Sequence, residues 1–598
     1  MTRLLALALA AALAAGCAGP PPQAAADRPL APEAASAFTP KPGWATTRFA
    51  VAAANPLATE AGHDILKAGG SAVDAAIAVQ MVLALVEPQS SGIGGGAFLL
   101  HFDGRQVEAY DGRETAPAGA DERLLLRPDG KPLAFYEAVV GGRAVGVPGA
   151  LRMLELAHRE HGLLPWARLF QPAIALADAG FPVSPRLHRL LSNDAHLKQD
   201  PVARAFFYRS DGSPVAIGAP LRNRELAAVL RRIAAEGSRA LHEGAVAQAI
   251  VRKVREHPTN PGRLALADLA AYQPKKRDAI CQAHRARGRT WRLCGFPPPG
   301  SGAIAIGQIL GILDAVRADA LPLADGLPAE DWLHLYLEAS RLALADRAQY
   351  VADPDFVQPP AGSWSSLLDP AYLRQRAQAI GKESMKQVQP GMPSGQRPGA
   401  APAPQQPEHG TSHISIVDGY GNALAMTTTI EDQFGSRQMV SVGGGPGGFM
   451  LNNELTDFSF APADAGGRPV ANRVQPGKRP RSSMAPTLVF DEQGRFVLST
   501  GSPGGALIIH YTAKTLYGVL HWGLNAQQAI DLPNFGTVGG PGLLEEGRFP
   551  ARTVQALRAR GAPLREQPLT SGLQAIQKTA AGYFGGADPR REGVVMGD

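Results

Sequence analysis

The sequence predicts an α+β protein in which two stacked β-sheets lie between layers of helices. Strand-like segments occur in two blocks, one that includes residues 97–102 and one that follows residue 411. Between these blocks, residues 146–385 are mostly helical in pattern. A sheet must bury at least one face, so two blocks of strands that flank a helical region favour two sheets packed together with helices outside.

The N-terminal block begins with two predicted helices. Residues 55–66 form the first, which Gly69-Gly70 ends, and an apolar helix then runs from Ser71 to about Val86. A glycine-rich turn over residues 91–96 leads into the strand at 97–102. Its glycines have a spacing like that of a dinucleotide-binding loop, but such a loop joins a strand to a helix. The helix–loop–strand order therefore argues against a nucleotide site.

The later elements follow from periodicity. Residues 151–161 and 166–179 repeat apolar positions with helical spacing. The predicted strands after residue 411 are 412–417, 423–429, 450–451, 487–490 and 496–499. Two more helices are expected at about 511–521 and 526–530.

Charge and residue usage exclude several classes of function. The chain has 59 Lys and Arg against 53 Asp and Glu, and its net charge of +6 is scattered over 598 residues. A nucleic-acid partner is therefore not expected. The 14 histidines are dispersed, and neither a CxxC nor an HExxH pattern is present. No metal and no cofactor are expected on this basis.

The N-terminus resembles a bacterial lipoprotein signal. Arg3 precedes an apolar run over residues 4–15, which is too short to span a bilayer, and Ala14-Ala15-Gly16-Cys17 resembles a lipoprotein cleavage box. We therefore expect a signal peptide at 1–16, an acylated Cys17, and an Ala/Pro-rich tether at 17–47. The expected location is the periplasm, with a lipid anchor in the outer membrane. The alternative is an ordinary cleaved signal peptide with an unmodified cysteine.

Two further cysteines, Cys281 and Cys294, flank a segment that resembles a hairpin with Gly288 near its turn. In an exported protein an even pair usually forms a disulfide. The alternative is two buried free thiols.

Thr411 stands at an unusual junction. The preceding segment, 384–408, is rich in Pro, Gly and Gln, whereas residues 414–418 alternate as in a buried strand. Cleavage of the Gly410–Thr411 bond would leave a hydroxyl nucleophile and an α-amine base on Thr411. This predicts a self-cleaving precursor with a large subunit, 48–410, that ends in a flexible surface linker, and a small subunit, 411–598. The simpler interpretation is that Thr411 only opens a strand.

Four motifs reverse that simpler interpretation. They are Asp-Gly-Arg-Glu-Thr-Ala-Pro at 111–117, Leu-Asn-Asn-Glu-Leu-Thr-Asp-Phe-Ser at 451–459, Gly-Lys-Arg-Pro-Arg-Ser-Ser-Met-Ala-Pro-Thr at 477–487 and Thr-Gly-Ser-Pro-Gly-Gly at 500–505. With Gly410-Thr411-Ser412-His413 they resemble the γ-glutamyltransferase (γ-glutamyltranspeptidase) family, from about residue 48 to the C-terminus. The resemblance implies an N-terminal nucleophile hydrolase fold and a precursor cut into two subunits.

The resemblance also assigns catalytic roles. Thr411 would be the nucleophile, and Thr429 would orient it through its hydroxyl. Gly504 and Gly505 would supply backbone N–H groups to an oxyanion hole.

A γ-glutamyl group carries one carboxylate and one ammonium, and the remaining motif residues suit both charges. Arg113 could bind the carboxylate with two parallel hydrogen bonds. The hydroxyls of Ser482 and Ser483 would add donors, and Glu454 and Asp457 would accept from the ammonium.

Two features depart from the family pattern. Glu431 stands where better-known members often have Asn, which adds a negative charge near the expected ammonium pocket or a different substrate contact. The segment between Asp457 and Ser482 is short and lacks a tyrosine found in some bacterial lid loops. Both features bear on specificity and on the efficiency of transfer.

The expected function is hydrolysis and transfer of the γ-glutamyl group of glutathione and related γ-glutamyl compounds, through a γ-glutamyl-threonyl intermediate. Water, an amino acid or a peptide would be the acceptor. One alternative is a glutaryl or cephalosporin-type acylase of the same family. Another, of a different class, is a processed but inactive lipoprotein with a binding role.

Overall fold

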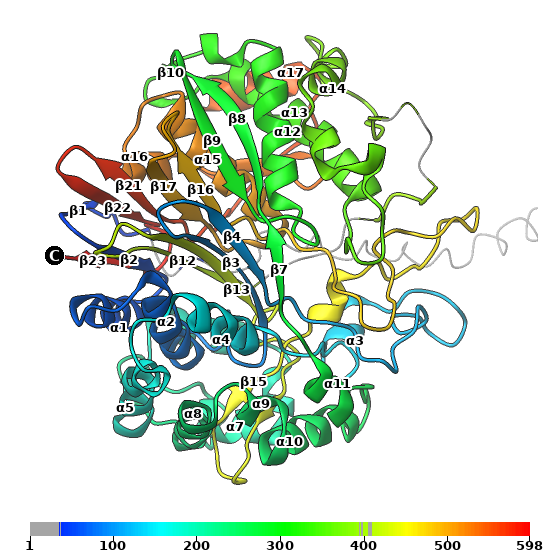
Figure 1. Ribbon diagram of the computed structural model, residues 1–598. Helices are drawn as coiled ribbons and strands as arrows, with labels where there is room; N and C mark the ends of the chain where they lie inside the picture. Colours follow the sequence, from blue (N-terminus) through cyan, green and yellow to red (C-terminus); the bar gives the residue numbers. More distant parts are fainter. Residues whose placement is uncertain (1–34, 36–37, 394, 396–398, 405–409) are drawn as a thin grey trace, which may run out of the picture. The chain divides into compact units, whose positions relative to one another are not determined.

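Two seven-stranded β-sheets are stacked on one another in the computed structural model, which describes residues 35, 38–393, 395, 399–404 and 410–598 (Figure 1). The sheet that carries Thr411, called the Thr411 sheet below, has the order β23 (Val594–Gly597), β2 (Ala50–Ala53), β12 (Thr411–Val417), β13 (Ala423–Thr429), β3 (Gly96–Phe102), β4 (Val107–Asp111) and β7 (Lys275–Asp278). The second sheet has the order β1 (Trp44–Thr46), β22 (Gly582–Ala587), β21 (Gln574–Thr579), β17 (Phe496–Gly501), β16 (Thr487–Phe490), β9 (Arg289–Gly295) and β8 (Ile280–Ala286). Strands β12 and β13 pack directly on β17, so the nucleophile strand lies between two layers.

Helices cover the outer face of each sheet (Figure 1). The Thr411 sheet is covered by α1 (Pro56–Lys67), α2 (Ala72–Val86) and α4 (Ala150–His161), with α5 (Gln171–Ala179), α8 (Arg224–Glu236) and α10 (Gly244–Arg255) farther along this side. The second sheet is covered by α12 (Gly302–Ala315), α15 (Ile508–Leu520) and α16 (Ala526–Asp531), and α13 (Glu330–Tyr350) packs on α12. Every residue of α2 is buried, because this helix lies between the sheet and α5.

Shorter elements complete the described chain. The helices are α3 (Phe135–Val139), α6 (Pro185–Asn193), α7 (Pro201–Phe207), α9 (Arg239–His242), α11 (Leu266–Ala271), α14 (Pro370–Ala377) and α17 (Ala551–Ala559). The small sheets pair β5 (Phe181–Pro182) with β6 (Pro220–Leu221), β10 (Leu323–Ala324) with β11 (Leu327–Pro328), β14 (Met439–Val440) with β15 (Phe449–Met450), and β18 (Phe535–Thr537) with β19 (Gly542–Glu545) and β20 (Leu564–Gln567).

Local sequence explains where the first helices begin. The side chain of Asn55 accepts a hydrogen bond from the Leu57 N–H, and Pro56 occupies the first turn of α1, where it loses no helical bond. Ser71 and Asp74 form a reciprocal capping box at the start of α2. Both helices lie within a residue or two of their predicted bounds.

The hairpin β12–β13 places the nucleophile. Its turn is fixed by Asp418, whose Oδ1 accepts hydrogen bonds of 2.9 Å from the backbone N–H groups of Tyr420 and Asn422. The antiparallel register that follows from this turn pairs Thr411 with Thr429. The two residues lie 18 positions apart in sequence, yet the hairpin brings their backbones opposite one another.

Three sequence expectations need correction. Within the mostly helical region 146–385, β7 is a strand of the Thr411 sheet that was not predicted, and the expected hairpin of β8 and β9 belongs to the second sheet. The helix expected over 166–179 is a 3-10 turn at Trp166–Phe170 followed by α5, whose first turn contains Pro172. The last strands, β21 to β23, were not predicted. β21 is rich in polar residues and β22 in Gly, and β23 has only four residues.

Cys281 and Cys294 form a disulfide with an S–S distance of 2.01 Å. They are opposite one another on β8 and β9, and the turn between the strands uses Arg287 and Gly288, both with positive φ. The expected hairpin is therefore present, with Gly288 where a two-residue turn needs a left-handed conformation.

The segment before Thr411 is only partly at the surface. Ala401 and Ala403 are buried against Val470, and their N–H groups donate to Pro469 and Ala348. The expectation of a linker that lies wholly on the surface therefore holds only in part. Cys17 and the signal segment lie outside the described residues. Among the helices that the structure describes, none is both long enough and apolar enough to cross a membrane.

Candidate active site

Two threonine hydroxyls converge on the carbonyl of Gly410. Thr411 Oγ1 donates to Gly410 O at 2.7 Å, and Thr429 Oγ1 donates to the same oxygen at 2.7 Å. Thr429 Oγ1 in turn accepts a hydrogen bond of 2.8 Å from the backbone N–H of Glu431. The cross-strand pairing of Thr411 with Thr429 makes this arrangement possible. The bond expected to be cut is therefore held between its own nucleophile and a second hydroxyl donor.

A small pocket opens beside this bond, and nearly all the predicted site residues line it. Its lining consists of Arg113, Thr411, Thr429, Glu431, Glu454, Asp457, Ser482, Ser483, Met484, Gly505 and Ile508. Thr411 and Thr429 come from neighbouring strands of the Thr411 sheet, and the others come from loops and from the start of α15. The fold therefore brings together residues that the sequence separates by almost 400 positions.

Gly504 and Gly505 lie where β17 turns toward α15. Their φ angles are +136° and +56°, values that favour glycine. A Cβ on Gly504 would lie 2.5 Å from Cε2 of the Tyr511 ring. Gly505 lines the pocket close to the N-terminal end of α15, where unsatisfied N–H groups favour negative charge.

The guanidinium of Arg113 is completely buried and is contacted by the two acids expected to bind the substrate ammonium. Its terminal nitrogens donate to Glu454 and to Asp457, and its Nε donates to Pro480 O at 3.1 Å. A further contact of 3.1 Å goes to the carbonyl of Arg481. The residue expected to bind the substrate carboxylate therefore contacts both acids expected to bind the substrate ammonium.

Burial shifts the protonation of the acids around Arg113. It raises the pKa of Glu454 well above the ordinary value, although the Arg113 charge acts in the opposite direction. Burial also raises the pKa of the neighbouring Glu114 to about 7. A pocket with one guanidinium and several crowded carboxyls cannot keep all of them ionised without a further cation.

Glu431 is held in a strained position inside the pocket. Its φ is +76°, and its Oε2 accepts hydrogen bonds from Asn453 and from Thr456, the latter at 3.2 Å. Its Oε1 has no hydrogen-bond partner among the described residues. Burial and the nearby carboxylate of Asp457 raise its pKa well above the ordinary value. Sequence reasoning gave no role to Asn453 or Thr456, because their contacts depend on the fold.

Ser482 and Ser483 are fixed from the other side of the pocket. Ser482 Oγ accepts from the Met484 N–H at 3.1 Å, and its carbonyl accepts from the Ser301 hydroxyl at 2.6 Å. Ser483 Oγ accepts from the buried Arg347 at 2.5 Å. Arg347 and Ser301 were missed in the sequence. The sequence offered one indication of this contact, because Arg347 lies among the apolar residues on the buried face of the long helix α13.

Among the described residues, four histidines lie with carboxylates in two groups outside this pocket. One group contains His101, Glu108 and His161, and the other contains His284, Asp314 and His521. Neither group shares a residue with the lining of the pocket.

Comparison with known proteins agrees with this architecture. Residues 58–598 match the family model described as Gamma-glutamyltranspeptidase. The chain is 36% identical over 561 residues to a glutathione hydrolase proenzyme of Bacillus subtilis, which covers 92% of this chain and 91% of the relative. It is 35% identical over 552 residues to the Acylase ACY 1 proenzyme of Pseudomonas sp. strain V22, with 90% and 92% covered.

A solved structure shows the same fold. The cephalosporin acylase from Bacillus halodurans superposes with a TM-score of 0.79 and 27% identity, over 93% of this chain and 97% of that one. The α+β prediction and the expected N-terminal nucleophile hydrolase fold are thereby confirmed. The named relatives include proenzymes of both kinds that the sequence suggested. The chain belongs to the gamma-glutamyltranspeptidase family of enzymes.

Proposed function

We propose that this chain is a self-processing γ-glutamyl hydrolase and transpeptidase that acts on glutathione and related γ-glutamyl compounds. The observation that carries the proposal is the pocket beside Thr411, in which one buried guanidinium faces the carboxyl groups of Glu454 and Asp457. A γ-glutamyl group presents a carboxylate and an ammonium on one carbon. The pocket therefore offers a partner of the correct sign for each charge.

Processing would begin at the Gly410–Thr411 bond. Attack of Thr411 Oγ1 on the Gly410 carbonyl carbon forms a five-membered ring, and the hydroxyl proton passes to the Thr411 nitrogen. Collapse of the ring breaks the C–N bond and leaves an ester on Oγ1. Water then hydrolyses the ester, which frees the Gly410 carboxylate, the Thr411 hydroxyl and the Thr411 amine. Thr429 supports this step because its hydroxyl donates to the oxygen on which charge develops. The products are a chain that ends at Gly410 and contains the tether and the large subunit, 48–410, and the small subunit, 411–598.

The same hydroxyl would then attack the substrate. Its proton passes to the new α-amine, and the γ-carbonyl oxygen takes up charge near Gly505 and the start of α15. The leaving amine departs with a proton and leaves a γ-glutamyl ester on Thr411. Water completes hydrolysis, whereas an amino acid or peptide amine completes transfer.

Binding would exchange partners within the pocket. The substrate carboxylate would take the place of Glu454 and Asp457 on Arg113, and the substrate ammonium would contact the released acids. Each buried charge then keeps a partner, which is the condition for burying charge at acceptable cost.

The acylase alternative is favoured by the similarity to Acylase ACY 1 and to the cephalosporin acylase structure. A glutaryl group, however, carries no α-ammonium. Its carboxylate would occupy Arg113 and leave Glu454 and Asp457 buried without a cation. The charge arrangement therefore favours γ-glutamyl donors.

A paired-substrate assay tests this choice. The purified enzyme is given γ-glutamyl-p-nitroanilide and glutaryl-p-nitroanilide, and kcat/KM is measured for each. We expect a preference for the γ-glutamyl donor, and we expect Asp457→Asn to lower kcat/KM for that donor alone by at least about tenfold, since it weakens a contact to a charged group. A wild-type preference for the glutaryl donor would overturn the proposal, and cleavage of neither would favour the inactive binding lipoprotein.

We also propose that the protein is exported and anchored by lipid on Cys17 to the outer membrane, facing the periplasm. The support is the sequence of residues 1–17, together with Ala18 after the cysteine. Acyl chains contribute about 0.8 kcal/mol per buried CH₂ group, which is sufficient for anchoring when several chains are attached. Cys17→Ser should move activity from the membrane fraction to the soluble fraction. Wild-type protein with an unmodified Cys17 would refute the anchor.

A further inference from the structure

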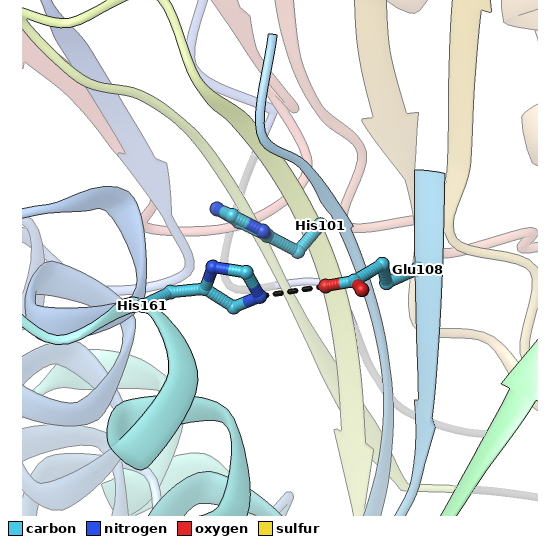
Figure 2. A group of neighbouring side chains, drawn as sticks. All are labelled: His101, Glu108 and His161. Carbon is cyan, nitrogen blue, oxygen red and sulfur yellow. Dashed lines mark hydrogen bonds and ion pairs between the residues drawn. The ribbon is translucent and has the colours of Figure 1, made fainter. Parts of the chain in front are cut away.

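Three potential metal ligands meet on the helix-facing side of the Thr411 sheet. His101 on β3 and Glu108 on β4 are cross-strand partners, and His161 is the last residue of α4, which packs on these strands. One ligand atom from each residue lies within 4.8 Å of the other two. Figure 2 shows the His101 ring beside the His161 ring, with Glu108 at the edge of the pair.

Of the three residues in this group, His101 is the one whose ring nitrogens have no hydrogen-bond partner among the described residues. Its exposed fraction is 1%. The dashed line in Figure 2 joins only His161 Nε2 and Glu108 Oε2, which are 2.6 Å apart. A buried polar group without a partner costs free energy, and nearly all such groups in proteins have one. A ligand beside His101 would remove that cost.

The neighbouring groups complete a polar surrounding for such a ligand. The Tyr110 hydroxyl lies 2.8 Å from both His161 Nε2 and Glu108 Oε2, and it donates to Glu160 at 2.6 Å. Lys276 contacts Glu108 at 2.6 Å and Glu160 at 2.7 Å. Glu108 and Glu160 together carry more negative charge than the single Lys276 can neutralise, which favours a cation at this place.

The group can be reached from solvent. The side chains of His161 and Glu160 are 18% and 34% exposed, whereas that of Glu108 is 10% exposed. An ion could enter past His161, and His101 would form the buried end of the site.

We propose that His101, Glu108 and His161 form a binding site for a borderline divalent metal ion, Zn²⁺ in particular. Two imidazoles and one carboxylate are a ligand set that suits Zn²⁺ and its neighbours among the transition metals. With bonds of about 2.0–2.2 Å, tetrahedral ligands lie roughly 3.3–3.5 Å apart. The His161–Glu108 pair would open slightly from 2.6 Å, and His101 would rotate toward it. Water or the Tyr110 hydroxyl would provide the fourth ligand.

The second histidine group is less suited to a metal. His284 Nε2 and His521 Nε2 are 2.8 Å apart and bond to one another, and His284 Nδ1 contacts Asp314 at 3.2 Å. These groups already satisfy one another, so no ligand is needed. His521 therefore provides a matched control for His101.

A metal at this place would hold β3 and β4 together at one end of the strands that support the active site. β3 begins at Gly96, which pairs with Thr429, and β4 ends two residues before Arg113. His101 lies five residues from Gly96, about 17 Å along the strand, so the site is structural and takes no part in the reaction.

The test uses the purified full-length enzyme without a histidine tag, stripped with EDTA and dialysed. Zn²⁺ binding is measured by titration calorimetry, thermal unfolding is followed at increasing Zn²⁺, and Co²⁺ is used as a spectroscopic probe. We expect one Zn²⁺ per chain, an unfolding temperature that rises with Zn²⁺ concentration, and visible Co²⁺ absorption bands typical of tetrahedral coordination. No bound Zn²⁺ in the wild-type enzyme would overturn the proposal.

Three variants show whether the ion binds at His101, Glu108 and His161. His101→Ala should weaken Zn²⁺ binding at least about a hundredfold, since even residues that only support metal ligands typically contribute 10–100-fold. His521→Ala should bind as the wild type does. Lys276→Met should bind several-fold more tightly, because it removes a positive charge beside Glu108, and this variant leaves the three ligands intact. Equal binding by His101→Ala and the wild type, or a loss confined to His521→Ala, would contradict the assignment.

Discussion

The hydroxyl of Thr429 offers the sharpest test of the processing geometry. It donates to Gly410 O at 2.7 Å and accepts from the Glu431 N–H at 2.8 Å. Thr429→Ala removes the donor from the carbonyl that must become an oxyanion. The nucleophile on Thr411 and its own contact with Gly410 are unchanged, so the variant isolates one contribution.

The magnitude follows from the kind of contact. Loss of one oxyanion donor typically costs about 2.7–4 kcal/mol, which slows the step about 10²–10³-fold. The Glu431 N–H also loses its acceptor, which destabilises the fold by about 1–3 kcal/mol. Because the second effect acts on the folded state as a whole, unfolding in urea measures it separately from the rate of cleavage.

The assay follows conversion of purified precursor into two bands on a denaturing gel, with N-terminal sequencing of the smaller band. Thr428→Ala is the matched control, since the Thr428 hydroxyl donates to Gly96 O at 3.2 Å rather than to Gly410 O. Thr429→Ser should restore most of the rate. Cleavage of Thr429→Ala within about tenfold of the wild type would refute the role given to this hydroxyl.

Three other variants test the buried charges. Arg113→Lys should raise KM for γ-glutamyl donors at least about tenfold, because an ammonium cannot reproduce the two parallel N–H donors of the planar guanidinium. The precursor should still be cleaved. An unchanged KM in donor kinetics would contradict the role of Arg113. Burial raises the pKa of Glu87 to about 8, so the folded state binds more protons than the unfolded chain between about pH 4.5 and 8, and stability falls as pH rises through that window. Glu87→Gln should remove up to about 1.4 kcal/mol per pH unit of this slope in urea unfolding, and an unaltered slope would count against it. Burial and the carboxylate of Asp457 raise the pKa of Glu431, which favours its neutral form. Glu431→Gln should therefore change KM for γ-glutamyl donors by less than about threefold, and a larger rise in donor kinetics would contradict this.

The sequence predicted the fold best where an element was long enough to show a clear hydrophobic periodicity. The apolar helix α2 and the hairpin strands β12 and β13 were found nearly to the residue, because capping and alternation act locally. The edge strands β1 and β23 were not, since three or four residues carry too little pattern. Their strand state depends on the neighbours that they pair with.

The residues of the candidate site were predicted from motifs, but the hydrogen bonds and ion pairs between them were not. Nothing in the sequence shows that Arg113 contacts Glu454 and Asp457, since more than 340 positions separate them. Arg347 and Asn453 support Ser483 and Glu431 through contacts that only the packed structure creates. The roles of the site residues remain predictions until the variants are measured.

The structure changes the meaning of Glu431. From the sequence, a glutamate in place of the family's Asn adds a negative charge beside the ammonium pocket. The buried carboxyl accepts hydrogen bonds from Asn453 and Thr456, and burial together with the nearby Asp457 carboxylate raises its pKa, which favours the protonated form. A protonated carboxyl is neutral and has one donor and one free acceptor, much like a carboxamide. The raised pKa of Glu431 therefore reduces the charge difference between this glutamate and an Asn, and Arg113 with its two acids can still match a γ-glutamyl zwitterion.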